Sequence, residues 1–311
     1  MPKEIKVLSV NISKKKGTIK LPVDFIELDE MGVKKDAHAG DWHRQVSLLA
    51  KKSIDKFSAV AGRKISFGEF AENITTDGII LDETHPFDRF LIGDAELEVT
   101  QIGKECHGDN CAIYREVGNC VMPKEGIFCR VLRPGKVQAG DKITFIPRIY
   151  KLMVITLSDR ASKGIYEDKS GPRVVALSEE FFKKLNWQSQ IRQVVIPDDE
   201  KSLQNLFKEA IEGNFDFVIT TGGTGIGPRD ITPEAVRSVI DKEIPGIMEM
   251  IRMKYGQEKP NALLSRSVAG VAGKTIIYAL PGSVRAVNEY MAEIIRTMKH
   301  TLYMLHGMDT H

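Results

Sequence analysis

One stretch of the chain decides its fold: Phe217-Val-Ile-Thr-Thr-Gly-Gly-Thr-Gly-Ile-Gly-Pro-Arg-Asp-Ile-Thr-Pro-Glu-Ala235. Phe217–Thr221 is a β-branched and aromatic run that is too short for a helix, so it predicts a buried strand. We expect a helix to begin at Thr232, with Thr232 as N-cap and Pro233 at the first helical position. Glycines between them can adopt positive φ and bring backbone N–H groups close to a ligand.

This glycine loop has the character of an anion site, because free N–H groups that lead into a helix N-terminus commonly bind phosphate. It is not a P-loop, since Pro228 and Arg229 follow Gly227 where Lys and Ser/Thr are required. It is not the dinucleotide fingerprint either, since its spacing is Gly223-x-Gly225-x-Gly227. The alternative is a tight strand-to-helix connection that binds nothing.

Strands and helices alternate on both sides of this loop, from about residue 151 onward. A continuous apolar run is typical of a parallel strand buried on both faces. The pattern therefore predicts an α/β three-layer sandwich with a mostly parallel sheet and helices on both faces. The expected strands are 152–157, 193–196, 217–221 and 275–280, and the expected helices start near Pro172, at Asp198 or Asp199, at Thr232 and after 281–283.

Polar residues follow each predicted strand, at the edge where open α/β folds bind ligands. They include Ser158-Asp-Arg160, Asp198, the glycine loop and Pro281-Gly-Ser283. Carboxylates beside phosphate-binding N–H groups suit Mg²⁺ on a nucleotide, which favours nucleotidyl or phosphoryl transfer. Taken singly, each aspartate has the alternative role of a helix cap or turn residue.

The N-terminal half predicts short strands and turns, with one helix over 53–61 that has Ile54, Phe57, Val60 and Ala61 on one face. Such a pattern is typical of an all-β barrel or sandwich. Two features bear on chemistry. The first is a polar loop with Asp36, His38, Asp41, His43 and Arg44, whose alternative is a solvated turn. The second is Cys106, which Lys104 and His107 could activate, and whose alternative is an inert buried thiol.

Composition limits the remaining possibilities. A chain of 311 residues predicts two domains, placed at 1–148 and 149–311. A net charge of +2 argues against nucleic acid as a partner. The sequence shows no membrane-spanning run and no signal peptide, so we expect a cytoplasmic protein. The spacing of the cysteines does not match paired zinc ligands, and a disulfide framework is not expected in the cytosol; they are Cys106, Cys111, Cys120 and Cys129.

The C-terminal half resembles the molybdopterin adenylyltransferase family over roughly residues 150–307. The residues that carry this resemblance are, in order, 158–161, 168–172, 196–198, 220–225, 229–230 with 232–233, 264–266 and 280–282. The resemblance implies transfer of AMP from Mg-ATP to the terminal phosphate of molybdopterin, with release of pyrophosphate, by a protein that is commonly trimeric. It assigns Asp198 and Asp230 as catalytic carboxylates that hold Mg²⁺. By position it implies a molybdopterin and nucleotide site formed by Ser158, Arg160, Thr221, Gly222, Gly223, Thr224, Gly225, Ser265, Pro281 and Gly282.

The N-terminal half, over roughly residues 5–147, resembles a MOSC domain, the C-terminal domain of molybdenum-cofactor sulfurases. Residues 36–49, Glu72-Asn-Ile74, Gly93-Asp94 and Cys106 carry this resemblance. It implies a β-barrel that binds molybdenum cofactor, with Cys106 as the thiol that handles sulfur or ligates metal. By position, the family's polar loop corresponds to Asp36, His38, His43 and Arg44. The additional cysteines depart from a single-cysteine pattern and leave open which thiol acts.

Together these observations predict a fusion protein of molybdenum cofactor biosynthesis. Its C-terminal half makes adenylyl-molybdopterin, and its N-terminal half binds, sulfurates or hands on the cofactor, with covalent linkage raising the effective concentration of the intermediate. Other proteins of this biosynthesis, or molybdoenzymes, are the expected partners. The alternative is a binding and delivery protein that holds molybdopterin without catalysing transfer. In a third hypothesis, the N-terminal half binds a sulfur species through Cys106 without molybdenum cofactor.

Overall fold

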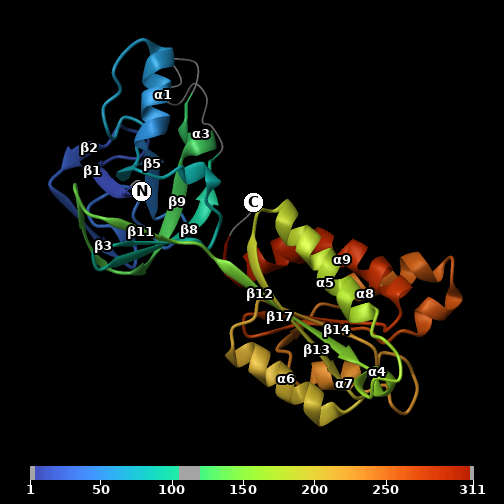
Figure 1. The fold of residues 1–311 in the computed structure, drawn as a ribbon. Coiled ribbons are helices and arrows are strands. Elements are labelled where there is room, and N and C mark those ends of the chain that lie inside the picture. Colours follow the sequence, from blue (N-terminus) through green and yellow to red (C-terminus); the bar gives the residue numbers. More distant parts are fainter. Residues whose placement is uncertain (1–3, 105–119, 309–311) are drawn as a thin grey trace. The chain divides into compact units, whose positions relative to one another are not determined.

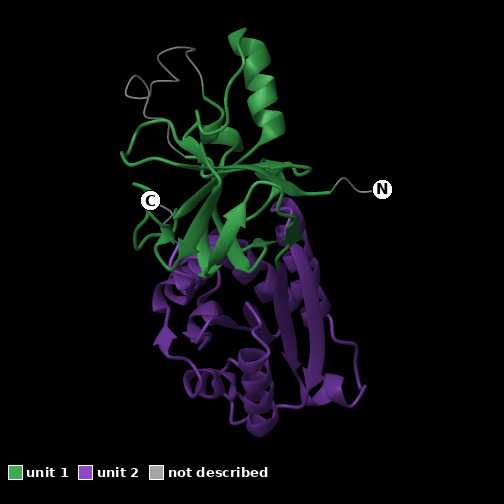
Figure 2. Ribbon diagram, turned by 90° about the vertical axis from the view of Figure 1, so that its left-hand side faces the viewer, with its two compact units in different colours: residues 1–148 green, residues 149–311 purple. Residues whose placement is uncertain are grey.

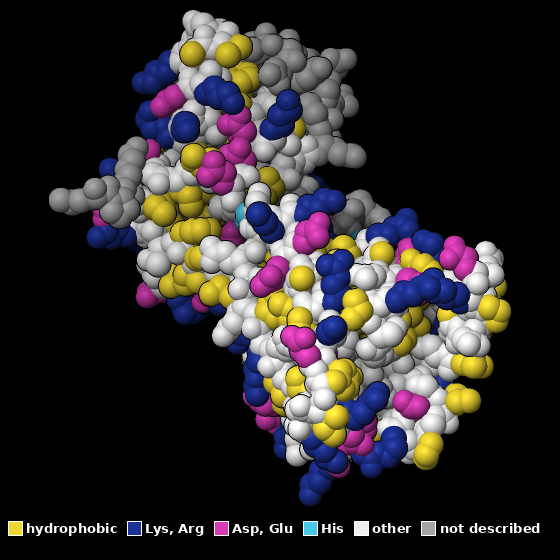
Figure 3. Space-filling view, turned by 45° about the vertical axis from the view of Figure 1, so that its right-hand side comes forward, with side chains coloured by type: hydrophobic (Ala, Val, Ile, Leu, Met, Phe, Trp, Pro, Cys, Tyr) yellow, Lys and Arg dark blue, Asp and Glu magenta, His cyan; other side chains and the backbone are white. Residues whose placement is uncertain are grey.

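The computed structural model describes residues 4–104 and 120–308. The chain forms two compact units, Met1–Arg148 and Ile149–His311 (Figure 2). Within the described residues, no helix combines the length and the apolar character needed to cross a membrane. On the face drawn in Figure 3, Lys and Arg side chains are interspersed with Asp and Glu, as expected for a net charge of +2.

The N-terminal unit is built from two sheets. The larger has the strand order β11-β7-β8-β9-β5-β6-β1-β2, and the smaller has the order β10-β3-β4. β5 and β6 pair in parallel, whereas β5 with β9 and β1 with β6 are antiparallel. The strands are β1 (Lys6–Ile12), β2 (Leu21–Val23), β3 (Phe25–Asp29), β4 (Gly32–Val33), β5 (Val46–Ala50), β6 (Ile74–Asp77), β7 (Arg89–Ile92), β8 (Ala95–Ile102), β9 (Ile127–Arg133), β10 (Gly135–Gln138) and β11 (Ile143–Ile146).

The larger sheet curls into a half-barrel around an apolar core. Backbone hydrogen bonds from Val7 N to Asp141 O and from Ile143 N to Ile5 O, each 2.9 Å, join the first strand to the start of β11. The core includes Val10, Leu48 and further apolar side chains of the same strands. A barrel was expected, and the curled half-barrel retains its inward-facing core.

One helix of this unit, α1 (Lys51–Ala61), begins two residues before the predicted range. Ile54 and Phe57 are buried as expected. Val60 is 74% exposed, so its predicted place on the apolar face is wrong. Six residues beyond Ile54, a side chain points roughly 120° away around the helix. The shorter helices are η1 (Leu81–Glu83) and α3 (Met122–Glu125).

The C-terminal unit has one sheet with the strand order β13-β12-β14-β17-β16-β15. β13–β12, β12–β14 and β14–β17 pair in parallel, and β17–β16 and β16–β15 pair antiparallel. The strands are β12 (Ile149–Leu157), β13 (Gln188–Ile196), β14 (Phe217–Thr221), β15 (Lys242–Glu243), β16 (Ala269–Ala272) and β17 (Thr275–Leu280). The helices are α4 (Asp159–Ser162), α5 (Ser170–Lys184), α6 (Glu200–Glu212), α7 (Thr232–Arg237), α8 (Pro245–Gly256), η3 (Pro260–Leu264) and α9 (Val284–Leu305).

Helices cover both faces of this sheet (Figure 1). On one face α6 and α7 pack against the sheet through an apolar cluster that includes Leu203, Phe207 and Val236. On the other face α5 and α9 lie together over an aromatic cluster in which the Tyr150 and Trp187 rings stack with centroids 4.0 Å apart. Burial on both faces explains why β12 is buried from Leu152 to Leu157 and β14 along its whole length.

The carboxyl ends of the parallel strands lie level with one another. In the register of the sheet, Leu157 pairs with Ile196, and Thr221 pairs with Leu280. The segments that follow these strands therefore leave the sheet at one edge, as the sequence predicts.

Candidate functional site

The glycine loop turns sharply out of β14 because Gly222 and Gly223 have φ of 99° and 62°. Gly222 also passes so close to β12 that a Cβ on it would lie 2.3 Å from the carbonyl oxygen of Leu157. A residue with a side chain would be strained at either φ, and at Gly222 its Cβ would also clash with Leu157. Two glycines of this loop are thus fixed by backbone geometry alone.

Thr232 holds the far end of the loop rather than capping a helix. The N-cap of α7 is Ile231, and Thr232 is the first helical residue. The Thr232 hydroxyl donates to the carbonyl oxygen of Gly222 at 2.9 Å, and its N–H donates to Gly223 O at 3.1 Å. The predicted N-cap role of Thr232 is therefore wrong, because a long-range partner engages its hydroxyl. α7 itself has only six residues.

Arg266 fastens the loop from the other side. Its Nε donates to Gly225 O and its Nη2 donates to Asp230 O, both at 2.6 Å. Its guanidinium also pairs with Glu234 at the start of α7. Arginine suits this position because its planar group presents several donors in fixed directions. The loop is therefore held in one shape before any ligand binds.

A cavity of about 530 Å³ opens beside the loop. It contains predicted site residues from four separate segments, which the fold brings together. Thr221 is not in the lining; it is buried, and its hydroxyl lies 2.9 Å from that of Ser170. The lining is formed by Gly222, Gly223, Thr224, Gly225, Asp230, Lys259, Asn261, Ala262, Leu264, Ser265, Pro281, Gly282, Ser283, Arg285, Ala286, Glu289 and Tyr290.

Asp230 presents its carboxylate to this cavity. Its Oδ2 accepts the N–H of Gly227 at 2.8 Å, which fixes the direction of the side chain. Gly225 leaves room for it, since a Cβ there would lie 2.7 Å from the same oxygen. The structure records no partner for Oδ1 of Asp230 among the described residues.

Asp198 lies at the end of β13 and is not part of the cavity lining. Its Oδ2 accepts the N–H of Asp159 at 3.1 Å, while Asp159 Oδ1 accepts the N–H of Asp198 at 3.2 Å. Arg229, next to Asp230 in the chain, donates to Asp159 Oδ2 at 2.6 Å and to Asp198 O at 3.2 Å. Arg229 thereby joins the glycine loop to the turns that follow β12 and β13.

Ser158 and Arg160 also lie outside the cavity lining. Ser158 is the N-cap of α4, and its hydroxyl accepts the N–H of Ala161 at 3.2 Å. The Arg160 guanidinium lies 5.2 Å from the centroid of the Tyr166 ring. The structure thus places these two predicted residues at the sheet edge but away from the cavity wall.

The two aspartates that follow β13 have different roles. Asp199 is the N-cap of α6, and its Oδ2 accepts the N–H of Ser202 at 2.7 Å. Hydrogen bonding to Ser202 lowers the pKa of Asp199 below its ordinary value. The helix therefore opens at the second of the two predicted positions, and Asp198 is not needed as its cap.

Mg²⁺ prefers one or two carboxylates together with phosphate oxygens and water. Asp198 and Asp230 each use Oδ2 in a recorded hydrogen bond to a backbone N–H, so each offers a carboxylate of fixed direction. Within residues 4–104 and 120–308, no group of three or more His, Cys, Asp or Glu side chains is arranged to hold a metal by itself. The carboxylates match the donor chemistry of Mg²⁺, with Asp230 in the cavity lining and Asp198 outside it.

Sequence reasoning missed several polar residues of the cavity wall. The sequence pattern places Tyr290 only on the apolar face of the last helix, yet its hydroxyl donates to Ser265 Oγ at 3.1 Å. Arg285 and Glu289 form an ion pair at 2.7 Å one turn apart on α9. No local motif marks these residues. An aromatic side chain with a polar tip in the first turns of a helix after Pro-Gly-Ser is the one signal that points to them.

Asp168, which belongs to one of the sequence motifs, accepts hydrogen bonds from several segments. Its Oδ2 accepts from Thr156 Oγ1 at 2.7 Å, and its Oδ1 accepts from the N–H and the hydroxyl of Ser170, each at 2.9 Å. Ser170 in turn contacts Thr221. Asp168 thus ties the start of α5 to β12 and to the residue that precedes the glycine loop.

In the N-terminal unit, the predicted polar loop surrounds a buried ion pair. Lys20 Nζ lies 2.6 Å from both carboxylate oxygens of Asp36, and both side chains are 1% exposed. The N–H groups of Ser13 and His38 donate to the same carboxylate at 2.9 Å. His38 Nδ1 lies 3.4 Å from Lys20 Nζ. Lys20 was not predicted.

Electrostatics in this cluster follow from burial and pairing. Burial alone would raise the pKa of Asp36, but hydrogen bonds from His38 and Lys20 outweigh it and hold the pKa far below its ordinary value. Burial lowers the pKa of Lys20 against the opposing charges of Asp36 and Glu72. Burial raises the pKa of Glu72, whose Oε1 accepts from the Gly68 N–H at 2.6 Å.

His43, Arg44 and Asp41 lie further along the same loop. His43 Nε2 lies 3.1 Å from Gln101 Oε1, and the Arg44 guanidinium lies 4.8 Å from the centroid of the Trp42 ring. Asp41 is exposed. The structure therefore brings Asp36 and His38 together with Lys20, while His43 contacts β8 and Arg44 stacks on Trp42.

Two of the four cysteines can be placed. Cys106 and Cys111 lie outside the described residues. Cys120 is half-buried, and Cys129 lies in β9 within the apolar core. Burial raises the pKa of the Cys129 thiol well above its ordinary value. A thiol in such a position is inert, so Cys129 has a packing role.

Two protein-family models match the chain. Residues 35–144 match the model described as "MOSC domain". Residues 153–300 match the model described as "Probable molybdopterin binding domain". Each match lies within one of the two compact units.

Named relatives resemble the C-terminal half. A molybdopterin adenylyltransferase of Helicobacter pylori is 37% identical over 154 residues, which cover 50% of this chain and 86% of that protein. Gephyrin of Dictyostelium discoideum is 35% identical over 160 residues, which cover 50% of this chain but only 22% of gephyrin. The solved structure of a tungsten cofactor synthesizing protein MoaB from Pyrococcus furiosus is 37% identical and covers 51% of this chain and 98% of that chain, with a TM-score of 0.45.

Proposed function

Through its C-terminal half the chain belongs to the molybdopterin adenylyltransferase family, and on that premise we propose that it transfers AMP from Mg-ATP to the terminal phosphate of molybdopterin. The products are adenylyl-molybdopterin and pyrophosphate. The N-terminal MOSC domain marks the same protein as one of molybdenum cofactor biosynthesis. The observation that carries the proposal is the cavity that Asp230 and the glycine loop line together.

The glycine loop is suited to bind phosphate. Gly222 and Gly223 expose backbone at positive φ, and Thr232 and Arg266 hold the loop in shape through its carbonyl oxygens. Because the carbonyls are engaged on the protein side, the loop can present N–H groups to an anion. Preorganised donors of this kind stabilise developing charge without having to reorganise during the reaction. In this proposal Ser265 and Pro281-Gly282 complete the wall that faces the pterin.

The reaction needs positioning and charge neutralisation more than proton transfer. A phosphate monoester is already an anion near neutral pH, so it can attack the α-phosphorus of ATP without a general base. Asp198 and Asp230 would hold Mg²⁺, which supplies neutralising charge to the phosphates when bound. Asp230 is oriented for this by the Gly227 N–H, and Asp198 by the Asp159 N–H. Arg229, next to Asp230, donates hydrogen bonds to Asp159 and Asp198. We therefore expect a change at one carboxylate segment to affect the other.

For the N-terminal unit we propose a role after adenylylation: binding, sulfuration or transfer of the cofactor. The buried pair of Lys20 and Asp36 fixes the loop that carries His38, so that loop is rigid before the cofactor arrives. Cys106 remains the candidate thiol on the grounds of resemblance, and it lies outside the described residues. A trimeric C-terminal half, and delivery to molybdoenzymes, are part of the same proposal.

The test of the C-terminal activity is direct. Purified full-length protein is incubated with Mg-ATP and molybdopterin, and pyrophosphate is measured. We expect release that depends on molybdopterin. Binding of molybdopterin without any pyrophosphate would favour the alternative, a protein that holds and delivers the cofactor.

The N-terminal role has its own test. A small-molecule persulfide can transfer its outer sulfur to the Cys106 thiol and leave as a thiol. Mass spectrometry after this reaction should find a persulfide on Cys106, and metal analysis should find molybdenum after loading with cofactor. A persulfide without molybdenum would support the third hypothesis, in which this domain handles sulfur alone. If neither a persulfide nor molybdenum is found, both hypotheses for the N-terminal domain are contradicted.

A further inference from the structure

Asp159 lies between the predicted site residues Ser158 and Arg160, and it links three segments of the C-terminal unit. Its Oδ1 accepts the N–H of Asp198 at 3.2 Å, and its Oδ2 accepts from Arg229 at 2.6 Å. Its own N–H donates to Asp198 Oδ2 at 3.1 Å. Asp159 therefore connects the turn after β12 with the turn after β13 and with the glycine loop.

The two contacts between Asp159 and Asp198 continue the parallel sheet beyond its last backbone pair. Leu157 pairs with Ile196 at the ends of β12 and β13, and the N–H of Ser158 donates to Ile196 O at 2.9 Å. Asp159 and Asp198 each lie two residues further along the chain, so they stand level with each other. Their carboxylates take the place of the backbone carbonyls that accept such N–H groups within a sheet. The register of the sheet therefore brings these two carboxylates together.

Arg229 reaches this pair from the glycine loop. Its Nη2 donates to Asp159 Oδ2 and, at 3.2 Å, to Asp198 O. Two neighbouring carboxylates repel each other, and the positive guanidinium offsets that repulsion. The next residue, Asp230, presents its carboxylate to the cavity. Asp198, which lies outside the lining, is thus connected to the cavity through the Arg229 side chain.

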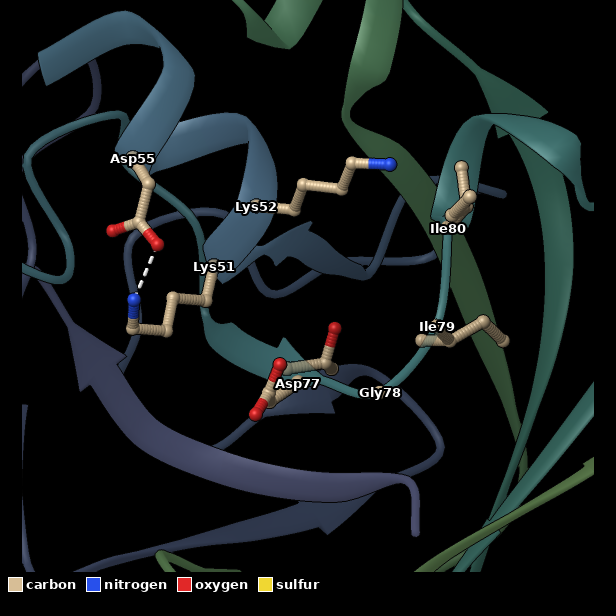
Figure 4. Close-up of a pocket in the computed structure, with 8 residues that line it drawn as sticks. Lys51, Lys52, Asp55, Asp77, Gly78, Ile79 and Ile80 are labelled. Carbon is tan, nitrogen blue, oxygen red and sulfur yellow. Dashed lines mark hydrogen bonds and ion pairs between the residues drawn. The ribbon is translucent and has the colours of Figure 1, made fainter. Parts of the chain in front are cut away.

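An ion pair within one helix provides a contrast. Figure 4 shows Lys51 and Asp55, which pair one turn apart on α1 in the wall of a cavity of about 440 Å³ in the N-terminal unit. That pair connects two residues of the same helix. Arg229 and Asp159 are 70 residues apart in the chain, and the Arg229 side chain is 65% exposed. Because exposed ion pairs stabilise a fold little, the main effect of this pair is to fix the position of the segments that it joins.

We propose that Asp159 is a positioning residue, which together with Arg229 holds the Asp198 carboxylate in a fixed place relative to Asp230. This role rests on the proposed adenylyl transfer, in which Asp198 and Asp230 act on one substrate. Asp159 itself is not assigned to bind the substrate or its metal, because both of its oxygens accept hydrogen bonds from the protein. Among the described residues no partner is recorded for Asp198 Oδ1, so Asp198 keeps an oxygen for that task.

The first experiment is a double-mutant cycle in the full-length protein, with Asp159→Asn, Arg229→Met and both changes together. Asn has one acceptor oxygen in place of two, so it cannot keep both contacts. The rate of pyrophosphate release should fall about tenfold in each single variant, as expected for loss of a charged hydrogen bond. The double variant should be no slower than the single ones, because each change removes the same link. Losses that multiply in the double variant would contradict a shared role.

Two further variants separate positioning from folding. Arg229→Lys should recover part of the lost rate, since Lys provides the charge without the planar group. Asp55→Asn breaks the ion pair of Figure 4 and should leave the rate unchanged. All these variants should unfold close to the temperature of the wild type, because each changes an exposed pair. A fall in unfolding temperature that parallels the loss of rate would show that Asp159 has a purely structural role.

A second readout needs no turnover. The Gly227 N–H donates to Asp230 Oδ2 at 2.8 Å, so its amide signal in isotope-labelled full-length protein reports the cavity end of the link. Without substrate, Asp159→Asn should shift this signal and Asp55→Asn should not. A wild type that releases no pyrophosphate would refute the proposed transfer, while the Gly227 signal would still decide whether Asp159 acts at a distance. An unchanged Gly227 signal in Asp159→Asn would overturn the positioning role.

Discussion

In the C-terminal unit, the cavity at the strand ends is lined largely by loop backbone and by side chains that reach solvent. In the N-terminal unit, the central pair of the predicted polar loop, Lys20 and Asp36, is 1% exposed and closed off. The first arrangement keeps its shape through glycine geometry and through hydrogen bonds to Thr232 and Arg266. The second keeps its shape through the charges themselves. Changes to carboxylates should therefore affect activity in one unit and stability in the other.

The largest expected effect is on stability, at Asp36. Asp36→Asn leaves Lys20 buried without its counter-charge, and breaking a buried pair in this way costs about 3–5 kcal/mol. Urea unfolding of the N-terminal transition measures it. The control is Glu27→Gln, which breaks the exposed pair with Lys34 at 3.2 Å and should cost less than about 1 kcal/mol. Equal, small losses in both variants would mean that the Lys20–Asp36 pair does not hold the loop.

Next in size is an effect on activity alone, at Asp198. Asp198→Asn should slow adenylylation at least about a hundredfold, or about 2.7 kcal/mol, with an unchanged unfolding temperature. The matched control is the neighbour Asp199, which caps α6. Asn caps a helix about as well as Asp, so Asp199→Asn should retain near-normal turnover. Similar rates of adenylylation for the two variants would contradict a role of Asp198 in the proposed metal site.

The dependence of stability on pH should also distinguish the units. The folded-state pKa of Asp36 is depressed, so its contribution is fully present above the unfolded value of about 3.9 and is lost as pH falls toward the folded value. The free energy of unfolding of the N-terminal unit should therefore fall below about pH 4. In Asp36→Asn that part of the decline should be missing. Parallel curves for variant and wild type would contradict the assigned charge state.

The smallest effect is expected at Tyr290, whose hydroxyl donates to Ser265 in the cavity wall. Tyr290→Phe removes one neutral hydrogen bond, worth about 1 kcal/mol, so KM for molybdopterin should rise about fivefold with little change in kcat. Tyr255→Phe is the control, because Tyr255 contacts Glu293 and is not part of the cavity lining. A change in KM for Tyr255→Phe of the same size would indicate a general effect on α8 and α9.

Local pattern predicted most of the regular structure. The sequence signals are strong for β12, β14 and β17, because these strands are buried along most of their length. The signal is also strong for α5, because this helix buries one face. Thr232 was misassigned because a Thr-Pro pair looks like a helix cap in sequence, and only the fold brings Gly222 O to its hydroxyl. Pattern also left Asp198 and Asp199 equivalent, since both precede the same helix.

The site was predictable where chemistry lies at strand ends and not where it depends on distant partners. Gly222–Gly225, Asp230, Ser265 and Pro281-Gly282 line one cavity, and their role in binding stays a prediction. Lys20 could not be foreseen, because it lies between Ile19 and Leu21, sixteen residues before Asp36, and no local pattern links the two residues. Tyr290 fits the apolar face of the last helix, so the pattern does not indicate that its hydroxyl contacts Ser265. Long-range pairing of single residues leaves no periodic signal in the chain.

The central claim is that Asp230 and the glycine loop form the site of adenylyl transfer. It is tested most directly by measuring pyrophosphate release from Mg-ATP and molybdopterin with the wild type and with Asp230→Asn, at matched thermal stability. The account predicts turnover by the wild type and at least about a hundredfold slower release by the variant, because the remaining amide cannot hold the metal. Near-normal release by Asp230→Asn would contradict it.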